Sequence, residues 1–244
     1  MKRTVLALLA GGLAIAAPAN ASFLLAIDAG GVLACASDNN TGCSFGTQLT
    51  DIDPMVGVMS FGNLPLIIGG LEITGSVQQA TVGGEFNILN TSSTQITNVS
   101  GANIAGTFAV SATGFTPPVS TAFVSGSATW QDAVGSSIQM GWYNDPSNAQ
   151  GAETATDTPG ISLFTCSDSV TLIADATACS NGPIAVSDLN PFSMTLFTAF
   201  NLAPGATVVN RGQTELKPVV ADVPEPAVLF MFGLGLVMLA RKRR

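Results

Sequence analysis

The 244-residue sequence contains no histidine. This absence excludes Ser-His-Asp and Cys-His catalysis, histidine-ligated zinc and the most usual general base at neutral pH. A glycine-rich phosphate loop is also missing, because the paired glycines at 69–70 and 83–84 lack the required spacing and a following helix. A pair of carboxylates such as Glu72 and Glu85 is the remaining route to glycoside cleavage. Two acids on candidate strands are commonplace, so we expect no enzyme.

Charged residues are scarce, at 10% of the chain against roughly a quarter in ordinary globular domains. Between Ser22 and Asp222 there are fifteen acids and two bases, Arg211 and Lys217, which gives a net charge of −13. Such a surface repels phosphate backbones, so we expect no nucleic-acid partner. The acids are scattered, which is typical of a solvated surface, and attraction of divalent cations is the alternative.

Long apolar runs are missing from the middle of the chain. The mean hydropathy is +0.44, yet no stretch of about 18 apolar residues, the length that crosses a bilayer as a helix, occurs between Ser22 and Asp222. Much of the apolar character lies at the two ends instead. We therefore expect a soluble middle region flanked by two special termini.

The N-terminus has the three parts of a secretory signal peptide. Lys2 and Arg3 supply the positive start, residues 5–17 form the apolar core, and Ala19-Asn20-Ala21 fits a small-x-small cleavage site. The sequence predicts a signal peptide over residues 1–21, which signal peptidase removes between Ala21 and Ser22. An uncleaved anchor is the alternative, although the apolar core is short for a membrane span.

The C-terminus combines a short apolar segment with a basic end. Residues 227–240 carry no charge, and Arg241, Lys242, Arg243 and Arg244 follow them. As a helix the segment reaches about 21 Å, short of the ~30 Å hydrocarbon core, and snorkelling and local thinning would make up the difference. The basic residues should stay on the cytoplasmic side, which leaves the preceding domain outside.

A Pro-Glu-Pro triplet, Pro224, Glu225 and Pro226, stands directly before this segment. Together with the apolar helix and the basic end, it resembles the PEP-CTERM sorting signal of Gram-negative bacteria, here over residues 223–244. The resemblance implies that the triplet is the recognition motif, that 227–240 is a transmembrane helix, and that 241–244 is a cytoplasmic stop. It also implies exosortase as the processing partner, the cell envelope, cell surface or extracellular matrix as the destination, and an association with exopolysaccharide and biofilm.

The triplet suits a processing site on chemical grounds as well. Proline on both sides keeps Glu225 out of a regular helix and favours an extended backbone that an enzyme can bind. A permanent anchor with a proline-rich collar is the alternative.

Short alternating runs fill the region between the termini. Period-two apolar patterns at 71–74, 124–130, 138–142 and 194–200 predict strands. Turn residues separate the runs at 69–70, 83–84, 117–118, 144–146 and 181–183. No window predicts an amphipathic helix. We therefore predict an all-β domain over 22–209, a β-sandwich with a jelly roll as a candidate topology, containing a surface loop at 150–159 and followed by a stalk at 210–222.

Four cysteines form two close pairs along the sequence, Cys35 with Cys43 and Cys166 with Cys179. Their spacing does not match a cysteine-only metal site. Four cysteines allow three disulfide connectivities, which a sequence does not distinguish, and local pairing is the expectation for an exported chain.

Three further features bear on ligands. Asp51 and Asp53 stand in an oxygen-rich turn that is a weak calcium candidate, with a local Asx turn as the alternative. Trp130 and Trp142 fall on the apolar phase of their strands, which favours core packing, whereas Tyr143 falls on the opposite phase. These features leave a structural or interaction protein as the first hypothesis and a carbohydrate-binding module, with or without calcium, as the alternative.

Overall fold

The computed structural model describes residues 22–40, 43–61, 65–75, 77–81 and 87–218. The signal peptide, the Pro-Glu-Pro triplet, the apolar segment and the basic end, all predicted from the sequence, lie outside these residues. Within them, no helix has the length and apolar character needed to cross a membrane.

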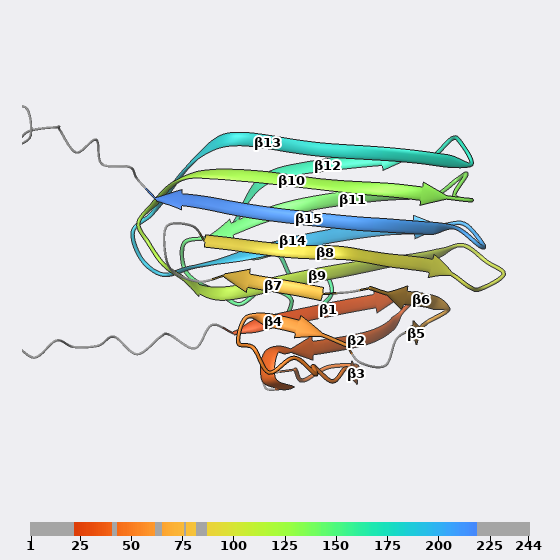
Figure 1. Cartoon of the computed structure of the whole chain (residues 1–244), viewed down its shortest axis with the longest axis horizontal. Coiled ribbons are helices and arrows are strands. Elements are labelled where there is room, and N and C mark those ends of the chain that lie inside the picture. The colour runs from red at the N-terminus through yellow and green to blue at the C-terminus, as the bar shows by residue number, and fades with distance from the viewer. Residues whose placement is uncertain (1–21, 41–42, 62–64, 76, 82–86, 219–244) are drawn as a thin grey trace, which may run out of the picture.

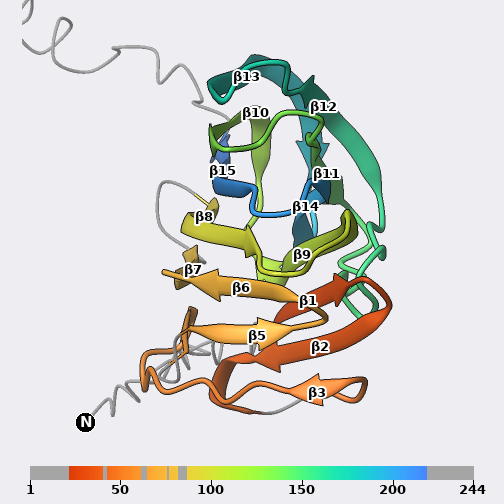
Figure 2. The same ribbon diagram turned by 90° about the vertical axis from the view of Figure 1, so that its right-hand side faces the viewer.

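Two β-sheets pack face to face (Figures 1 and 2). The seven-stranded sheet has the order β12 (Ile161–Ser169), β11 (Ser137–Asp145), β14 (Phe192–Leu202), β9 (Ile104–Phe115), β1 (Phe23–Ala29), β2 (Val32–Ser37) and β3 (Thr47–Gln48). The eight-stranded sheet runs β13 (Ala174–Asp188), β10 (Val119–Gln131), β15 (Thr207–Pro218), β8 (Asn87–Asn98), β6 (Leu71–Thr74) and β5 (Leu66–Ile68). Its remaining strands are β7 (Val77–Thr81), which pairs with β8, and β4 (Val58–Ser60), which pairs with β7.

The last eight strands form a jelly roll. Strands β8, β10, β13 and β15 belong to one sheet, and β9, β11, β12 and β14 belong to the other. The orders β13-β10-β15-β8 and β12-β11-β14-β9 are those of two Greek keys folded over each other. The earlier strands extend both sheets on the β8 and β9 side, so the predicted β-sandwich is confirmed.

The core lies between the sheets and comes from the alternating residues that the sequence pattern singles out. Trp130 and Trp142 are 2% and 1% exposed, which confirms their predicted place in the core. Ile138, Met140 and Leu196 are buried beside them. The four predicted strands fall within β6, β10, β11 and β14.

The C-terminal stalk predicted at 210–222 is wrong over residues 210–218. These residues belong to β15, which lies between β10 and β8 inside the eight-stranded sheet. The inward positions of β15 include Asn210 and Thr214, both buried, and the Asn210 side chain donates a hydrogen bond to the Thr198 hydroxyl at 2.9 Å. Polar residues on the core side removed the apolar alternation that would have identified the strand.

The turn predicted at 181–183 is also wrong, because Asn181, Gly182 and Pro183 lie within β13. Opposite them, β10 advances by two residues from Ala122 to Val124 while β13 spans three steps, which makes a β-bulge. Gly182 has a φ of 146°, a conformation open to glycine, and β13 is the edge strand, where proline is tolerated.

The predicted surface loop at 150–159 is partly a cover for the outer face of the seven-stranded sheet. Ala152 and Ala155 are buried there against Leu24, Ala26 and Ala109. This gives the sheet a second, smaller apolar layer outside the main core. The eight-stranded sheet has no such cover over β10 and β15 among the described residues, and its outer face carries the site described below.

The two ends of the domain leave the sandwich together. The start of β1 and the end of β15 lie at the same end of the molecule (Figure 1). The tight turns at Gly30 and Gly31, at Gly69 and Gly70 and at Gly205 lie at the opposite end.

Candidate functional site

The two calcium candidates serve as turn caps. The Asp51 Oδ1 atom accepts hydrogen bonds from the backbone N–H groups of Asp53 and Ser60, each at 3.0 Å. The Asp53 Oδ1 atom accepts one from the Met55 backbone N–H at 2.8 Å. The bonds from Asp53 and Met55 are those of Asx turns, and the bond from Ser60 connects the first turn to β4. The described part of the chain contains no group of three or more Asp, Glu, Cys or His that could hold a metal ion, so calcium stays a prediction from the sequence alone.

One pair of carboxylates has perturbed acidities. Asp145 ends β11 and Asp188 ends β13, and the Asn144 side chain donates a 2.7 Å hydrogen bond to Asp188 Oδ2. Burial raises the pKa of Asp188, the Asn144 bond offsets part of this rise, and the nearby charge of Asp145 adds to it. Burial also acts to raise the pKa of Asp145, but hydrogen bonds from Ser147 and Ala149 outweigh it and lower that pKa.

Two carboxyl groups with opposed pKa values are a pattern found in acid–base catalysis. Here Asp188 is 2% exposed, and its Oδ1 atom has no partner within the described residues. Neither Asp145 nor Asp188 lines any of the depressions described below. Both carboxyl groups are buried and bonded to neighbouring residues, so we assign the pair to the structure of this end of the sandwich.

The outer face of the eight-stranded sheet carries an open depression of about 730 Å³, which we call the sheet groove. Strands β8, β10, β13 and β15 form it, and they lie side by side in Figure 1. Its lining is made mostly of hydroxyl, amide and small side chains: Asn90, Thr91, Ser125, Gly126, Ser127, Ala178, Cys179, Ser180, Arg211, Gly212 and Gln213.

Register explains why these residues, distant in sequence, share one surface. Ser125 lies opposite Ser180 on one side and opposite Gln213 on the other, and Gln213 lies opposite Asn90. This row crosses four strands with hydroxyl and amide groups alone. Small side chains at the centre leave the depression, and the amides at its wall supply donors and acceptors.

Two bulges flank the groove. The bulge in β13 places two residues opposite Phe123, and a second bulge in β8 places two residues opposite Arg211. Bulges bend a strand, increase its twist and redirect side chains next to binding sites. Phe123 and Arg211, two of the largest side chains at the groove, thus both stand where the sheet is locally distorted.

The groove continues lengthwise along β10 into a second depression of about 350 Å³. Phe123, Asn181 and Glu215 line this extension, which shares Ser125 and Gln213 with the groove. The Lys217 ammonium lies 4.5 Å from the centroid of the Phe123 ring and 3.5 Å from a Glu215 carboxylate oxygen. A partly exposed aromatic ring is therefore fixed beside the polar groove by a cation–π contact.

Aromatic residues at the groove differ from those that the sequence analysis considered. Trp130 and Trp142 are core residues, and Tyr143 is half-buried on β11 of the other sheet. Phe123 was missed, although a signal exists. Phe123 and Val124 are adjacent apolar residues in a strand whose even-numbered positions face inward, so Phe123 has to face outward.

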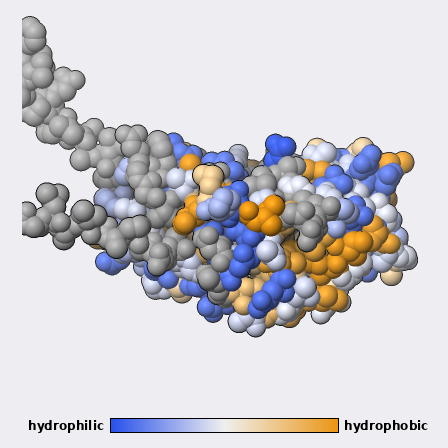
Figure 3. Space-filling model, turned by 60° about the horizontal axis from the view of Figure 1, so that its bottom comes forward, coloured by the Kyte–Doolittle hydropathy of each residue, from blue (hydrophilic) through white to orange (hydrophobic). Residues whose placement is uncertain are grey.

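Two other surface features lie away from the groove. A depression of about 720 Å³ between the glycine turns is lined partly by Asp28, Ser100 and Asn103. Apolar surface gathers on the edge formed by the N-terminal strands, which Figure 3 turns toward the viewer. The exposed large apolar side chains among the described residues of this part are Val32, Leu33, Ile52, Met55, Val56 and Ile67.

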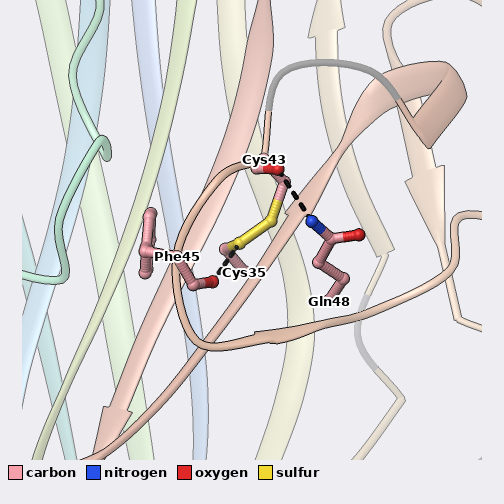
Figure 4. The surroundings of a disulfide bond; sticks show 4 residues. All are labelled: Cys35, Cys43, Phe45 and Gln48. Carbon is pink, nitrogen blue, oxygen red and sulfur yellow. Dashed lines mark hydrogen bonds between the residues drawn. A yellow bond between two sulfur atoms is a disulfide. The ribbon is translucent and has the colours of Figure 1, made fainter.

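Both disulfides join the cysteines that are close in sequence, as local pairing predicted. Cys35 of β2 pairs with Cys43 at a Cα–Cα distance of 5.9 Å, and the Gln48 side chain donates a 3.0 Å hydrogen bond to the Cys43 carbonyl oxygen (Figure 4). Cys166 of β12 pairs with Cys179 of β13 at 6.3 Å, which links the two sheets at their edge. Cys179 also lines the sheet groove, so this cross-link holds one wall of it.

A family described as the PEP-CTERM protein-sorting motif matches residues 222–244, and no curated protein matches the chain. The match confirms the resemblance of the C-terminus. It implies a chain that is exported through the membrane to the cell envelope or surface of a Gram-negative bacterium and is targeted to exosortase.

Solved structures similar to the chain include the carbohydrate-binding module TmCBM61 in complex with β-1,4-galactotriose, with a TM-score of 0.34 and 7% identity, covering 60% of this chain and 88% of that one. The C-terminal CBM6 module of LamC from Zobellia galactanivorans has a TM-score of 0.23 and 11% identity, over 59% and 90% of the two chains. The infectious bursal disease virus Gx strain structure has a TM-score of 0.27 and 11% identity, over 89% and 55%. Likeness at this level says nothing of ligand or activity, which have to be argued from the chain's own surface.

Proposed function

We propose that this chain, which carries the PEP-CTERM protein-sorting motif at residues 222–244, is an envelope or matrix protein whose jelly-roll domain binds extracellular polysaccharide in the sheet groove. The proposal combines the two hypotheses from the sequence: the protein interacts with the exopolysaccharide matrix, and it does so by binding carbohydrate. Exosortase processing of the tail is the step that delivers the domain to its place of work.

The observation that carries the proposal is the lining of the sheet groove. Ser125, Ser127 and Ser180 offer hydroxyl groups, and Asn90 and Gln213 offer amides that both donate and accept. Sugar hydroxyl groups need such paired donors and acceptors when they leave water. The Phe123 ring in the extension adds an apolar surface for the C–H face of a sugar ring.

The shape of the groove favours a polymer over a small molecule. The groove lies open on a sheet face and continues into its extension along β10, so a chain that enters need not end inside it. Small-molecule sites, by contrast, are usually enclosed and largely apolar.

The same lining favours binding without cleavage. Hydrolysis of a glycosidic bond needs two carboxyl groups, one on each side of the bond. Among the residues that line the groove and its extension, Glu215 is the one acid, and it is ion-paired with Lys217. The chain also contains no histidine, the most usual general base at neutral pH.

Binding of the full-length protein, in mild detergent, to exopolysaccharide from its native host tests this proposal. Ser125→Trp should fill the groove and weaken binding at least tenfold, because an indole would occupy the space that the polymer needs. Thr129→Trp is the matched control, since Thr129 is exposed on the same strand and the same face but outside the groove, and should bind like the wild type.

Circular dichroism would establish that both variants fold. Equal binding by the two tryptophan variants, or no binding by the wild type, would overturn the proposal. A parallel titration with chelator tests whether binding depends on calcium.

A further inference from the structure

We propose that the sheet groove selects acidic polysaccharide and holds a carboxylate of the polymer on the Arg211 guanidinium. This inference rests on the proposed function and specifies the class of glycan. The inference is argued from the positions of the basic and acidic side chains over the whole domain, in addition to the residues that line the groove.

The two basic residues between Ser22 and Asp222 lie on one strand of one sheet face. Arg211 and Lys217 are both on β15, and their register partners on β10 are Ser127 and Thr121, which face outward. Arg211 lines the sheet groove, and Lys217 lies over the Phe123 ring in the extension. Both cations of this region therefore lie on the strand that crosses the groove, one in the groove lining and one beside the extension.

Acidic side chains are kept away from the same surface. Strands β13, β10, β15 and β8 contain three acids, Asp175, Asp188 and Glu215. Asp188 is buried, and Asp175 lies opposite the buried Trp130, which places it on the inner phase of β13. Glu215 is neutralised by its ion pair with Lys217. The outer face of these four strands is therefore net positive on a strongly negative domain.

The two cations differ in availability. Lys217 is engaged by the Glu215 carboxylate and by the Phe123 ring. Arg211 is exposed and, within the described part of the chain, makes no ion pair or side-chain hydrogen bond. An arginine fork with its donors unused matches the two oxygens of a carboxylate, which it binds in a bidentate manner.

The neighbours of Arg211 suit the rest of an acidic sugar. Ser127 is its register partner on β10, and Ser125 and Gln213 lie two residues further along the groove. A uronate carboxylate on Arg211 would place the ring hydroxyl groups of the same or the next sugar over these side chains.

The negative charge of the whole domain does not prevent this binding at physiological salt. The Debye length is about 8 Å at 0.15 M, so charges farther away than this from the groove are largely screened. A bidentate contact to Arg211 acts at hydrogen-bond distance, where screening is weak. Affinity for an acidic polymer should therefore depend mainly on Arg211 and should be at least as high at physiological salt as at low salt, where the acids of the domain repel the polymer over a longer distance.

The experiment compares two forms of the host's exopolysaccharide, one native and one with its uronic acids chemically reduced to neutral sugars. Full-length wild type, Arg211→Gln and Arg211→Lys are titrated with each form at low and physiological salt. We expect carboxyl reduction to weaken wild-type binding about tenfold or more, the effect of losing one charge-assisted contact. Arg211→Gln should bind the native polymer as weakly as the wild type binds the reduced one, and carboxyl reduction should not weaken binding by this variant any further. Arg211→Lys should retain part of the wild-type affinity for the native polymer.

The outcomes separate the two proposals. Equal binding of native and reduced polymer, with no effect of Arg211→Gln, overturns the acidic-glycan inference and leaves polysaccharide binding standing. A wild type that binds neither form overturns the proposed function and this inference with it. Alginate and dextran, an anionic and a neutral polymer, serve as defined probes and should show the same preference.

Discussion

The indole ring of Trp142 lies directly beneath the backbone of Gly126. A Cβ atom added at Gly126 would stand 2.7 Å from Trp142 Cζ2 and 3.1 Å from Met140 Sδ. Gly126 belongs to the floor of the sheet groove, and Trp142 comes from β11 of the opposite sheet. The main core is therefore packed against the underside of the groove at this point, without a side chain in between.

Gly126→Ala should destabilise the domain by about 1–3 kcal/mol, because overpacking a filled core forces side chains or backbone to shift. Urea denaturation followed by tryptophan fluorescence would measure the change. Gly101→Ala is the control, since a Cβ there meets nothing within 4 Å and needs no unusual φ, and should alter stability by less than about 0.5 kcal/mol. Equal stability of the two variants would contradict the prediction, because it would mean that Trp142 can shift to make room for the added methyl group without a loss of stability.

Replacing Cys166 and Cys179 together by serine should cost about 2–4 kcal/mol. The bond closes a loop of sequence separation 13 between two edge strands. Neither β12 nor β13 contains a fully buried apolar residue, so few apolar contacts would remain to hold the sheets together at this edge. The free energy of unfolding from urea titration is the measurement.

The Cys35 and Cys43 double serine variant is the matched comparison for that cross-link. This bond joins β2 to the segment before β3, beside strands that bury several apolar residues fully. Wild type denatured in reducing buffer should be less stable than either double variant in oxidising buffer. A Cys166 and Cys179 variant as stable as the wild type would contradict a structural role for the cross-sheet bond.

The strands that the sequence predicts are those whose core-facing positions are mostly apolar. Positions 124–130 and 138–142 alternate cleanly because one side faces the core, and the structure places them in β10 and β11. Positions 194–200, in β14, keep apolar residues at most core-facing positions although Phe197 packs on the outer face. Strand β15 has Asn210 and Thr214 on its core side, and β13 contains a glycine and a proline at a bulge. In β15, hydrogen bonding across the core permits polar residues that the local pattern assigns to a stalk. In β13, the edge position permits a glycine and a proline that the local pattern assigns to a turn.

The groove was beyond prediction for a different reason. It depends on the register between strands far apart in sequence, such as Thr91 and Gly212, which pair across 121 positions. Alternation does show which residues of a strand face outward, and it contains the signal, not used in the prediction, that places Phe123 on the surface. It does not show which outward residues of four strands meet.

Replacing Asp188 by asparagine should raise stability at neutral pH. The pKa of Asp188 is raised on folding, so the folded state holds this proton more tightly and loses stability as pH rises through the folded pKa. The advantage of Asp188→Asn should therefore be full at neutral pH and vanish as pH falls below the unfolded value of about 3.9. Urea titrations between pH 3.5 and 7 would measure it.

Asp145→Asn should behave with the opposite sign. The pKa of Asp145 is lowered, so its carboxylate contributes stability above the unfolded pKa that is lost as pH falls through the folded pKa. This variant should be less stable than the wild type at neutral pH and approach it in acid. Parallel pH profiles for the two variants would contradict the opposed pKa shifts of the pair.

The tail makes a prediction that intact mass can decide. Protein recovered from the native envelope and medium should begin at Ser22 and end near the Pro-Glu-Pro triplet at 224–226, because we expect signal peptidase and exosortase to remove the two ends. Replacing Pro224, Glu225 and Pro226 by alanine should leave residues 227–244 attached and keep the protein in the membrane fraction, whereas Val223→Ala should be processed normally. A wild-type mass that retains residues 227–244 in every fraction would make the tail a permanent anchor, and the sheet groove would then act on polymer at the inner-membrane surface.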